Sequence, residues 1–184
     1  MEQLPITIES LHSNGGARTV TRAVFPPGAS AVMHYHTQYN ESFRVIEGQL
    51  ILIKSGKEFK LNIGQLSPEI EFTEIHTYKN KSDHEVIVDI ILEPGHQGCE
   101  DSNLILAALA KENKLGLLSK KYSLFWLAFY DLTNTIPVGL AKTLCSMATF
   151  YYGRKRIKRY QRFLLSMVEN LRLKKVEEKT VATD

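Results

Sequence analysis

The first half of the chain consists of short apolar or alternating runs, each ended by residues that favour turns. The runs ESFRVIE, QLILIK and EVIVDIIL are typical, and glycine, proline, asparagine or serine separates such runs. Many short runs at this spacing predict an all-β sandwich or barrel. Between two of them, Lys54 to Lys57 is predicted to form a hairpin turn, because Gly56 adopts a positive φ at low cost.

This strand pattern ends at residues 93–98, a run that contains a proline and two glycines. Leucine, alanine, lysine and glutamate are frequent beyond it, and these residues favour helices. We therefore predict a barrel over residues 1–96 and a helical extension over residues 97–184. Its three or four helices are expected from Asp101 or Ser102 to about Lys114, from Ser119 to Leu132, from Pro137 to Tyr152 and from Arg154 to about Lys175.

Four side chains of the strand region have the chemistry of metal ligands. Residues i and i+2 of a strand project from one face, so His34 and His36 point together while Tyr35 points away. After a short turn, Glu41 begins another strand and is expected to place a carboxylate beside the two imidazoles. His76 is flanked by aromatic and β-branched residues and is expected to add a third imidazole from a neighbouring strand.

The pattern G-x5-H-x-H-x4-E-x6-G over residues 28–48 resembles the first motif of the cupin superfamily at every defined position. The second motif of that family is matched at Gly64, His76 and Asn80, while the run SPEIEFTEIH replaces its internal proline and glycine. The resemblance covers about residues 17–93 and implies a double-stranded β-helix, or jelly-roll, barrel. It also implies that one metal ion is held by His34, His36, Glu41 and His76.

Three imidazoles and one carboxylate form a donor set that suits iron, manganese, nickel, zinc or copper. A metal held by four protein groups keeps positions open, where a substrate oxygen, dioxygen or water binds and is polarised. The resemblance implies a dioxygenase-like or isomerase-like enzyme for a small organic molecule. Glu74 and Tyr78 stand two positions either side of His76, so on a strand they are expected to share its face, and they are the predicted proton-transferring residues. The alternative is a non-catalytic cupin that senses a small molecule and contacts a partner or membrane surface through its helices.

Charge is distributed unevenly along the chain. Residues 151–184 carry ten lysines and arginines against four acidic residues, whereas residues 1–150 carry thirteen against sixteen. Nucleic-acid binding is not expected, because no zinc-finger, homeodomain or RNA-recognition motif accompanies the basic end. The apolar runs within residues 117–160 predict buried helices. A weak contact with an anionic membrane surface is the alternative, because the basic run RKRIKR follows directly.

The cysteines and the first residues bear on compartment and assembly. Cys99 and Cys145 lie 46 positions apart without metal-binding spacing, and the opening run MEQLPITIES does not resemble a secretory leader. These features predict a reduced, cytoplasmic protein. The apolar helical extension, together with the frequent association of cupins, predicts a homodimer.

Overall fold

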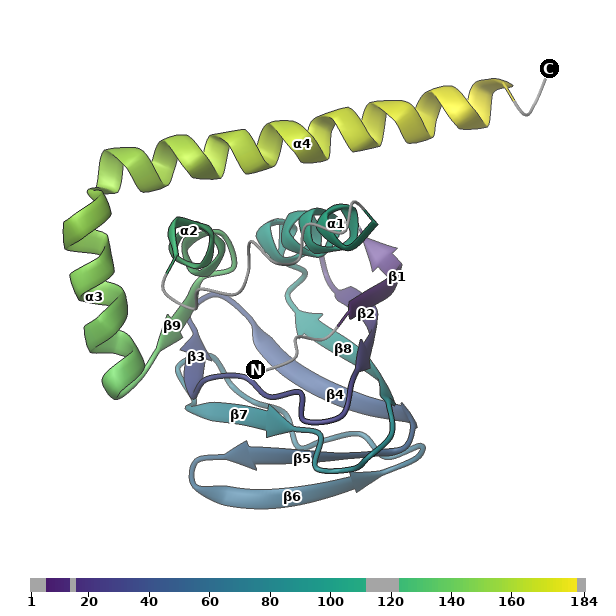
Figure 1. The fold of residues 1–184 in the computed structure, drawn as a ribbon. Helices are drawn as coiled ribbons and strands as arrows, with labels where there is room; N and C mark the ends of the chain where they lie inside the picture. Colours follow the sequence, from purple (N-terminus) through teal and green to yellow (C-terminus); the bar gives the residue numbers. More distant parts are fainter. Residues whose placement is uncertain (1–5, 14–15, 112–122, 182–184) are drawn as a thin grey trace.

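The computed structural model describes residues 6–13, 16–111 and 123–181 (Figure 1). Within these ranges the strands form two antiparallel sheets that pack face to face. One sheet has the strand order β1 (Ile6–Ser13), β2 (Thr19–Phe25), β8 (Val86–Glu93) and β4 (Asn40–Glu47). The other has the order β6 (Lys57–Asn62), β5 (Gln49–Lys54), β7 (His76–Lys79), β3 (His34–His36) and β9 (Thr135–Pro137). This arrangement confirms the predicted barrel of the double-stranded β-helix kind.

The interior of the barrel is filled by apolar side chains that alternate along facing strands. Phe43 and Val45 of β4 are fully buried, and Leu50 and Leu52 of β5 meet them in the same core. Every second residue of a strand points the same way, so the alternation in the sequence brings these side chains inside. Burial of each such side chain contributes roughly 1.5–3 kcal/mol to folding.

The turn between β5 and β6 confirms the predicted hairpin. Lys54 pairs with Lys57 across the turn, and Ser55 and Gly56 both have positive φ, at 48° and 77°. Positive φ at both central positions is the type I′ geometry, whose twist matches that of the flanking strands.

Four helices lie within the described ranges, and some of their bounds differ from the predicted ones. They are α1 (Gln97–Lys111), α2 (Leu124–Leu132), α3 (Leu140–Tyr152) and α4 (Arg154–Val181). The predicted start of α1 was wrong, because the helix already begins at Gln97, and Asp101 and Ser102 lie buried inside it. Pro137 does not open α3, because it is the last residue of β9. The predicted limits at Lys114 and Ser119 lie outside the described residues.

The first turn of α1 is fixed by a buried contact and a close approach. Thr19 of β2 donates a hydrogen bond to the carboxylate of Glu100 at 2.7 Å. A carboxylate in the first turn also interacts favourably with the helix dipole. Only glycine fits at Gly98, because a Cβ atom there would lie 2.0 Å from the carbonyl oxygen of Leu132. The start of α1 is therefore held against β2 on one side and the end of α2 on the other.

The short strand β9 was not predicted, and it belongs to the extension. It pairs antiparallel with β3, with Pro137 opposite His34 and Thr135 opposite His36. The division into a barrel over residues 1–96 and an extension over residues 97–184 stays a prediction. The extension nevertheless adds β9 to the sheet that contains β3.

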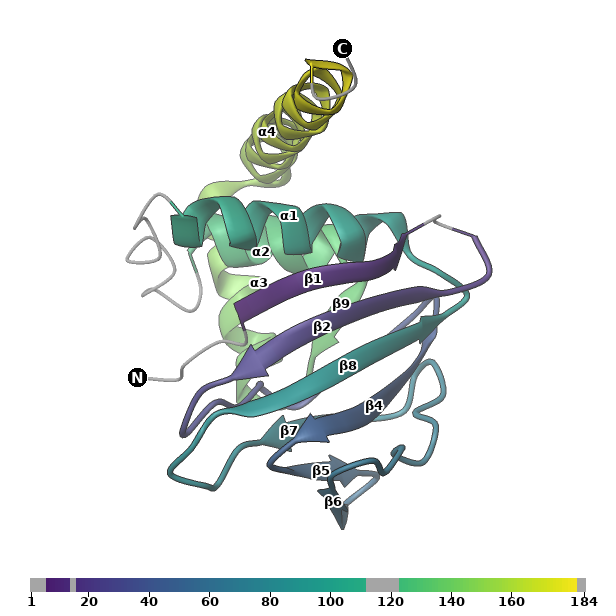
Figure 2. The ribbon, with the colours of Figure 1, turned by 90° about the vertical axis from the view of Figure 1, so that its right-hand side faces the viewer.

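The helices cover one side of the barrel. Figure 2 shows α1 lying along β1, and Figure 1 shows α4 crossing over α1 and α2. A second apolar cluster joins α1, α2 and α4, and its buried members are Ile105, Leu109, Phe125, Trp126, Leu127, Ala128, Ile157, Leu164 and Val168. The apolar run of α2 is buried as predicted, whereas α3 has no buried residue. In the described part of the chain, no helix is both long enough and apolar enough to cross a bilayer.

Candidate metal centre

Three histidines and one glutamate meet at the end of the barrel where β3 pairs with β7. His34 stands directly opposite His76, and His36 lies on the same face of β3 as His34. Glu41 reaches them from β4 in the facing sheet. One ligand atom from each of these four residues lies within 4.8 Å of the other three. The structure thus brings together the four residues that were predicted to bind a metal, in a buried position.

Backbone carbonyls orient two of the rings. His34 Nδ1 lies 2.7 Å from the carbonyl oxygen of Val32, and His76 Nδ1 lies 2.9 Å from the carbonyl oxygen of Glu74. A carbonyl oxygen only accepts, so each ring donates its Nδ1 proton and turns its Nε2 atom toward the cluster. Such a hydrogen bond commonly sets the tautomer of a metal-binding histidine.

The ring of His36 is oriented by side chains instead. Its Nδ1 lies 2.8 Å from the hydroxyl of Tyr39 and 3.2 Å from the hydroxyl of Thr135. The hydroxyl of Tyr39 donates its proton to the carbonyl oxygen of Thr133 at 3.0 Å. Its oxygen is therefore free to accept from His36 Nδ1, which leaves the lone pair of His36 on Nε2.

The Nε2 atom of His36 is buried and has no hydrogen-bond partner among the described residues. Glu41 Oε2 lies 3.4 Å from it and 2.9 Å from His76 Nε2. A carboxylate and an imidazole lone pair are both acceptors, so a proton or a cation must lie between them to avoid an unsatisfied buried pair. A divalent metal ion would satisfy all of these atoms together, so the residues present fit the predicted metal.

Burial and mutual contact set the charges of this cluster. Burial, with the neighbouring rings of His76 and His36, lowers the pKa of His34 to about 3, so this ring is neutral at pH 7. Burial acts to raise the pKa of Glu41, but its contacts with His36 and His76 outweigh burial and hold that pKa well below its usual range. Burial acts to lower the pKa of His76, and the contact with Glu41 outweighs it and raises that pKa. The Glu41 carboxylate therefore stays ionised at neutral pH beside the imidazole rings, and a buried carboxylate among imidazoles favours a cation.

Glu74, one of the two predicted proton-transferring residues, lies away from the ligand atoms. It precedes β7, and its carboxylate accepts from the hydroxyl of Ser55 at 2.7 Å and pairs with Lys54 Nζ at 3.0 Å. The expected position of Glu74 on the strand was therefore wrong, because β7 begins only at His76. Its backbone carbonyl, not its carboxylate, contacts the cluster.

Tyr78, the other predicted proton-transferring residue, lies in the apolar core of the barrel. It shares a face of β7 with His76, as expected. Its ring centroid lies 4.8 Å from that of Phe25 and 5.8 Å from that of Phe43. A catalytic role for Glu74 or Tyr78 stays a prediction.

Sequence reasoning did not single out Tyr39 or Thr135, although both contact a histidine of the cluster. Tyr39 lies in the turn between His36 and Glu41, where the motif leaves the residue type open. Thr135 stands 99 positions from His36 along the chain, and no local pattern connects the two residues. Only the pairing of β9 with β3 brings them together.

Cys99 of α1 extends the network around Tyr39. Its Sγ donates to the Tyr39 oxygen at 3.2 Å. Burial raises the pKa of the Cys99 thiol to about 12, so it is a neutral donor rather than a nucleophilic thiolate. Residues of α1 and β9 thus surround the Nδ1 side of the His36 ring, while the motif residues face its Nε2 side.

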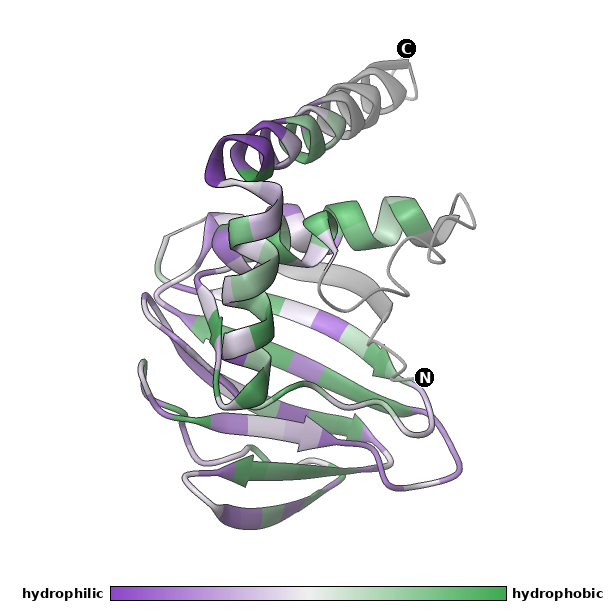
Figure 3. Ribbon diagram, turned by 60° about the vertical axis from the view of Figure 1, so that its left-hand side comes forward, coloured by the Kyte–Doolittle hydropathy of each residue, from purple (hydrophilic) through white to green (hydrophobic). Residues whose placement is uncertain are grey.

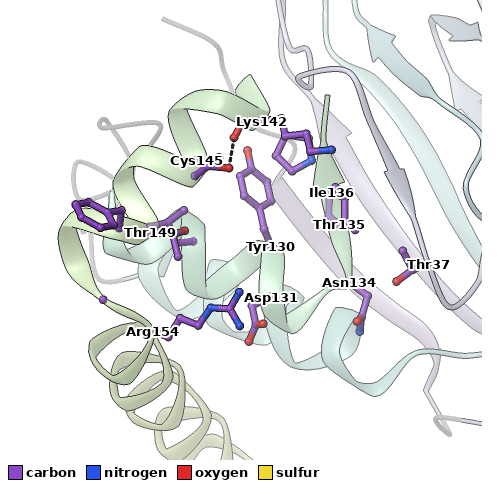
Figure 4. Close-up of a pocket in the computed structure, with 15 residues that line it drawn as sticks. Thr37, Tyr130, Asp131, Asn134, Thr135, Ile136, Lys142, Cys145, Thr149 and Arg154 are labelled. Atoms are coloured by element: carbon purple, nitrogen blue, oxygen red, sulfur yellow. Dashed lines mark hydrogen bonds between the residues drawn. The ribbon is translucent and has the colours of Figure 1, made fainter. Parts of the chain in front are cut away.

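A cleft of about 830 Å³ lies between α2, β9 and α3 (Figure 4). Apolar and charged side chains line it, among them Tyr130, Ile136, Lys142 and Arg154. Thr135 forms part of its wall, yet the four residues of the metal cluster do not line it. The cleft therefore adjoins the site on the side of Thr135 and does not open onto the ligand atoms.

Comparison with known proteins gives matches over the barrel. A family model described as Cupin domain matches residues 21–92. Quercetin 2,3-dioxygenase of Bacillus subtilis is 28% identical over 94 residues, which cover 51% of this chain and 27% of that enzyme. The chain thus spans about a quarter of the length of this curated relative.

Solved structures match the same region. An uncharacterized conserved protein with a double-stranded β-helix domain from Klebsiella pneumoniae has a TM-score of 0.44 at 19% identity, over 52% of this chain and 81% of that chain. A sugar phosphate isomerase from a cupin superfamily, from Silicibacter pomeroyi, has a TM-score of 0.39 at 22% identity, over 42% of this chain and 50% of that chain. Both matches cover about half of the present chain or less.

Proposed function

The chain belongs to the cupin superfamily through residues 21–92, and we propose that it is a metal-dependent enzyme acting on a small organic molecule. One divalent transition metal would be held by His34, His36, Glu41 and His76. The observation that carries this proposal is the buried Nε2 of His36, which lacks a hydrogen-bond partner among the described residues and faces the other three groups. The chemistry would be dioxygenase-like or isomerase-like, and similarity to quercetin 2,3-dioxygenase supports the first.

The residues of the site have separate parts in this proposal. When bound, the metal supplies Lewis acidity and, for iron, manganese, nickel or copper, a change of oxidation state. Glu41 offsets part of the charge of the cation. The carbonyls of Val32 and Glu74 and the hydroxyl of Tyr39 keep the ring protons on Nδ1, so that the Nε2 lone pairs converge. The apolar core beneath the site excludes water from that side.

Glu74 or Tyr78 is the proposed proton-transferring residue of this enzyme. Burial acts to raise the pKa of Glu74, but the contacts with Ser55 and Lys54 outweigh it and lower that pKa, so Glu74 is a carboxylate at pH 7. Glu74→Gln and Tyr78→Phe keep the side-chain shape. A fall in kcat of about 100-fold with unchanged metal content would place the residue in the chemistry. An unchanged kcat would show that the substituted residue takes no part in proton transfer.

The metal content of the purified full chain tests the proposal most directly. Protein prepared without added metal is analysed by elemental mass spectrometry, together with the double variant His34→Ala/His36→Ala. The matched control is His84→Ala, because His84 is exposed and contacts only Asp83 among the ion pairs of the described residues. We expect one equivalent of a transition metal in the wild type and in the control, and none in the double variant. Wild-type protein that takes up no transition metal even after incubation with excess would overturn the proposal.

Activity is tested separately from metal content. Oxygen uptake is measured with the metal-loaded chain and quercetin, the compound after which the Bacillus subtilis relative is named, and then with other small phenols and enols. Isomerisation of small hydroxy-carbonyl compounds is followed by proton NMR. Turnover that disappears in the double variant supports the enzyme. Stoichiometric metal without turnover would favour the alternative below.

The alternative is a non-catalytic cupin that senses a small molecule and signals through its helices. One observation favours it: Thr135 of the extension contacts His36, so a change at the site can be transmitted to α2 and α3. Hydrogen exchange of α2 and α3, measured with and without bound metal, distinguishes the two. Faster or slower exchange in these helices on metal binding, without turnover, supports the sensor.

Assembly and compartment complete the proposal. Cys99 and Cys145 are free thiols, which suits the reducing cytoplasm. Homodimerisation is tested by sedimentation equilibrium of the full chain, where a single monomeric species at high protein concentration would refute it.

A further inference from the structure

One side of α3 is apolar and exposed. Leu140, Met147, Phe150 and Tyr151 have relative exposures of 76%, 63%, 92% and 81%. Their spacing along the sequence places these four side chains on one face of the helix. The other side carries Cys145, Ala148 and Tyr152, which pack against the second apolar cluster. A helix that docks by one narrow face and exposes large apolar residues on the other indicates a contact with something outside the chain.

The segment that follows is strongly basic. Residues 132–168 contain no aspartate or glutamate, and Arg154 to Arg162 includes six lysines and arginines. All six are exposed: Arg154, Lys155, Arg156, Lys158, Arg159 and Arg162. Lys158 pairs with Asp131 of α2, and the guanidinium of Arg156 lies 5.6 Å from the ring centroid of Tyr152. This segment therefore provides dense positive charge directly after the end of α3.

The two features meet at a corner of the fold. Gly153 has a φ of 75°, a conformation that other residues rarely adopt, and the chain turns there from α3 into α4. Phe150 and Tyr151 stand four positions before Arg154 and Lys155, and Phe150 and Arg154 line the same cleft. Figure 3 shows the mostly hydrophobic α3 followed directly by the hydrophilic start of α4.

We propose that this corner docks the protein onto an anionic lipid surface. The α3–α4 surface is defined as the four exposed apolar residues of α3 together with the six cations of α4. Apolar and aromatic side chains enter the boundary between headgroups and acyl chains, and lysine and arginine bind the anionic headgroups. The contact lies on the membrane and does not span it.

The charge of this surface and the type of its exposed side chains together favour a lipid surface over a second copy of the chain or a nucleic acid. A second copy of the chain, docked symmetrically through this surface, would bring two basic clusters together, and the neighbouring carboxylate of Asp131 already pairs with Lys158 of its own chain. A single-stranded nucleic acid would use aromatic rings for stacking but gains nothing from the exposed aliphatic Leu140 and Met147. An anionic bilayer uses both the aliphatic and the charged residues.

Vesicle co-sedimentation of the full chain tests the proposal. The probes are vesicles of phosphatidylcholine alone and of phosphatidylcholine mixed with phosphatidylserine, at low and at high salt. We expect binding to the anionic vesicles only, and weaker binding at high salt because salt screens the headgroup attraction. Binding to both vesicle types alike, or no binding at low salt, would overturn the proposal.

Matched variants separate the two halves of the surface. Arg154→Glu/Lys155→Glu is compared with Lys57→Glu/Lys60→Glu, which makes the same charge change on exposed residues of β6. The first pair is expected to lower the partition coefficient about tenfold or more, and the second to change it little. Phe150→Ser is likewise compared with Phe72→Ser, an exposed phenylalanine of the barrel. Only Phe150→Ser is expected to weaken binding.

Further outcomes decide against the proposal. Dimers that Phe150→Ser dissociates, with no vesicle binding by the wild type, would assign the surface to a second copy. Binding of single-stranded RNA that survives Phe150→Ser, without vesicle binding, would assign it to nucleic acid. Metal content is measured in every variant and is expected to stay unchanged, because none of the substituted residues contacts the metal cluster. The vesicle-binding result can therefore be interpreted even if the proposed metal site is wrong.

Discussion

The strands of the barrel turn their large apolar side chains inward, whereas α3 of the extension turns several of its own toward solvent. Phe43 of β4 is fully buried, while Phe150 of α3 is the most exposed large apolar residue of the described chain. In the barrel, three histidines and one glutamate are also buried and converge on one point. This difference indicates that the barrel can hold an ion inside, while α3 can make contacts through its outer surface.

The largest expected effect compares the same substitution in the two regions. Phe43→Ala removes a fully buried ring and should lower the free energy of unfolding by about 3–5 kcal/mol. Phe150→Ala should change it by no more than about 0.5 kcal/mol, because the side chain is exposed. Urea unfolding followed by circular dichroism measures both. A large loss for Phe150→Ala would show that α3 is covered in solution and would break the comparison.

The second prediction concerns the charge inside the barrel. Glu41→Gln keeps the shape of the side chain but removes its negative charge, so metal affinity should fall on the order of 100-fold. Competition titration with a chelating dye measures the affinity. The control Glu58→Gln changes an exposed carboxylate of β6 and should leave metal affinity unchanged. Equal affinity in Glu41→Gln and wild type would remove Glu41 from the ligand set.

The third prediction follows from the lowered pKa of His34 in the metal-free protein. Its pKa is about 3 in the folded chain, against 6.5 for an unperturbed histidine, so the unfolded state binds more protons between these values. Stability should therefore fall as pH decreases from about 6.5 toward 3. Urea unfolding in the presence of a chelator, at several pH values, measures this slope. The variant His34→Gln should have a shallower slope over the same range, and an identical slope would contradict the assignment.

The smallest expected effect tests the contact between the two regions. Thr135→Val removes the hydroxyl that touches His36 Nδ1 while keeping the side-chain volume. Metal affinity should fall about tenfold, the lower end for loss of a group that orients a metal-binding histidine. Thr143→Val, on the exposed face of α3, is the matched control. Equal affinity in all three proteins would mean that the extension does not support the site.

Much of the barrel and of the site could be predicted from local patterns. The alternation in β4 favours burial of Phe43 and Val45 together, because a strand has a fixed period of two. The same period placed His34 and His36 together, and the motif spacing added Glu41. Glu74 was misplaced because the start of β7 is set by its pairing with β5, which a run of turn and strand residues does not reveal.

The sequence by itself determined the strand region, the change to helices after residue 93 and the four residues of the metal cluster. The strands, the helices and the group of His34, His36 and Glu41 depend on periodicity or spacing over a few residues, whereas His76 was assigned through the resemblance to the cupin motifs. Only the tertiary structure decided that Thr135 returns to His36 across 99 positions, that Tyr39 links this ring to Thr133, and that α2 is buried while α3 is exposed. These contacts depend on how distant segments pack, and the burial of α2 follows from its packing in the apolar cluster with α1 and α4.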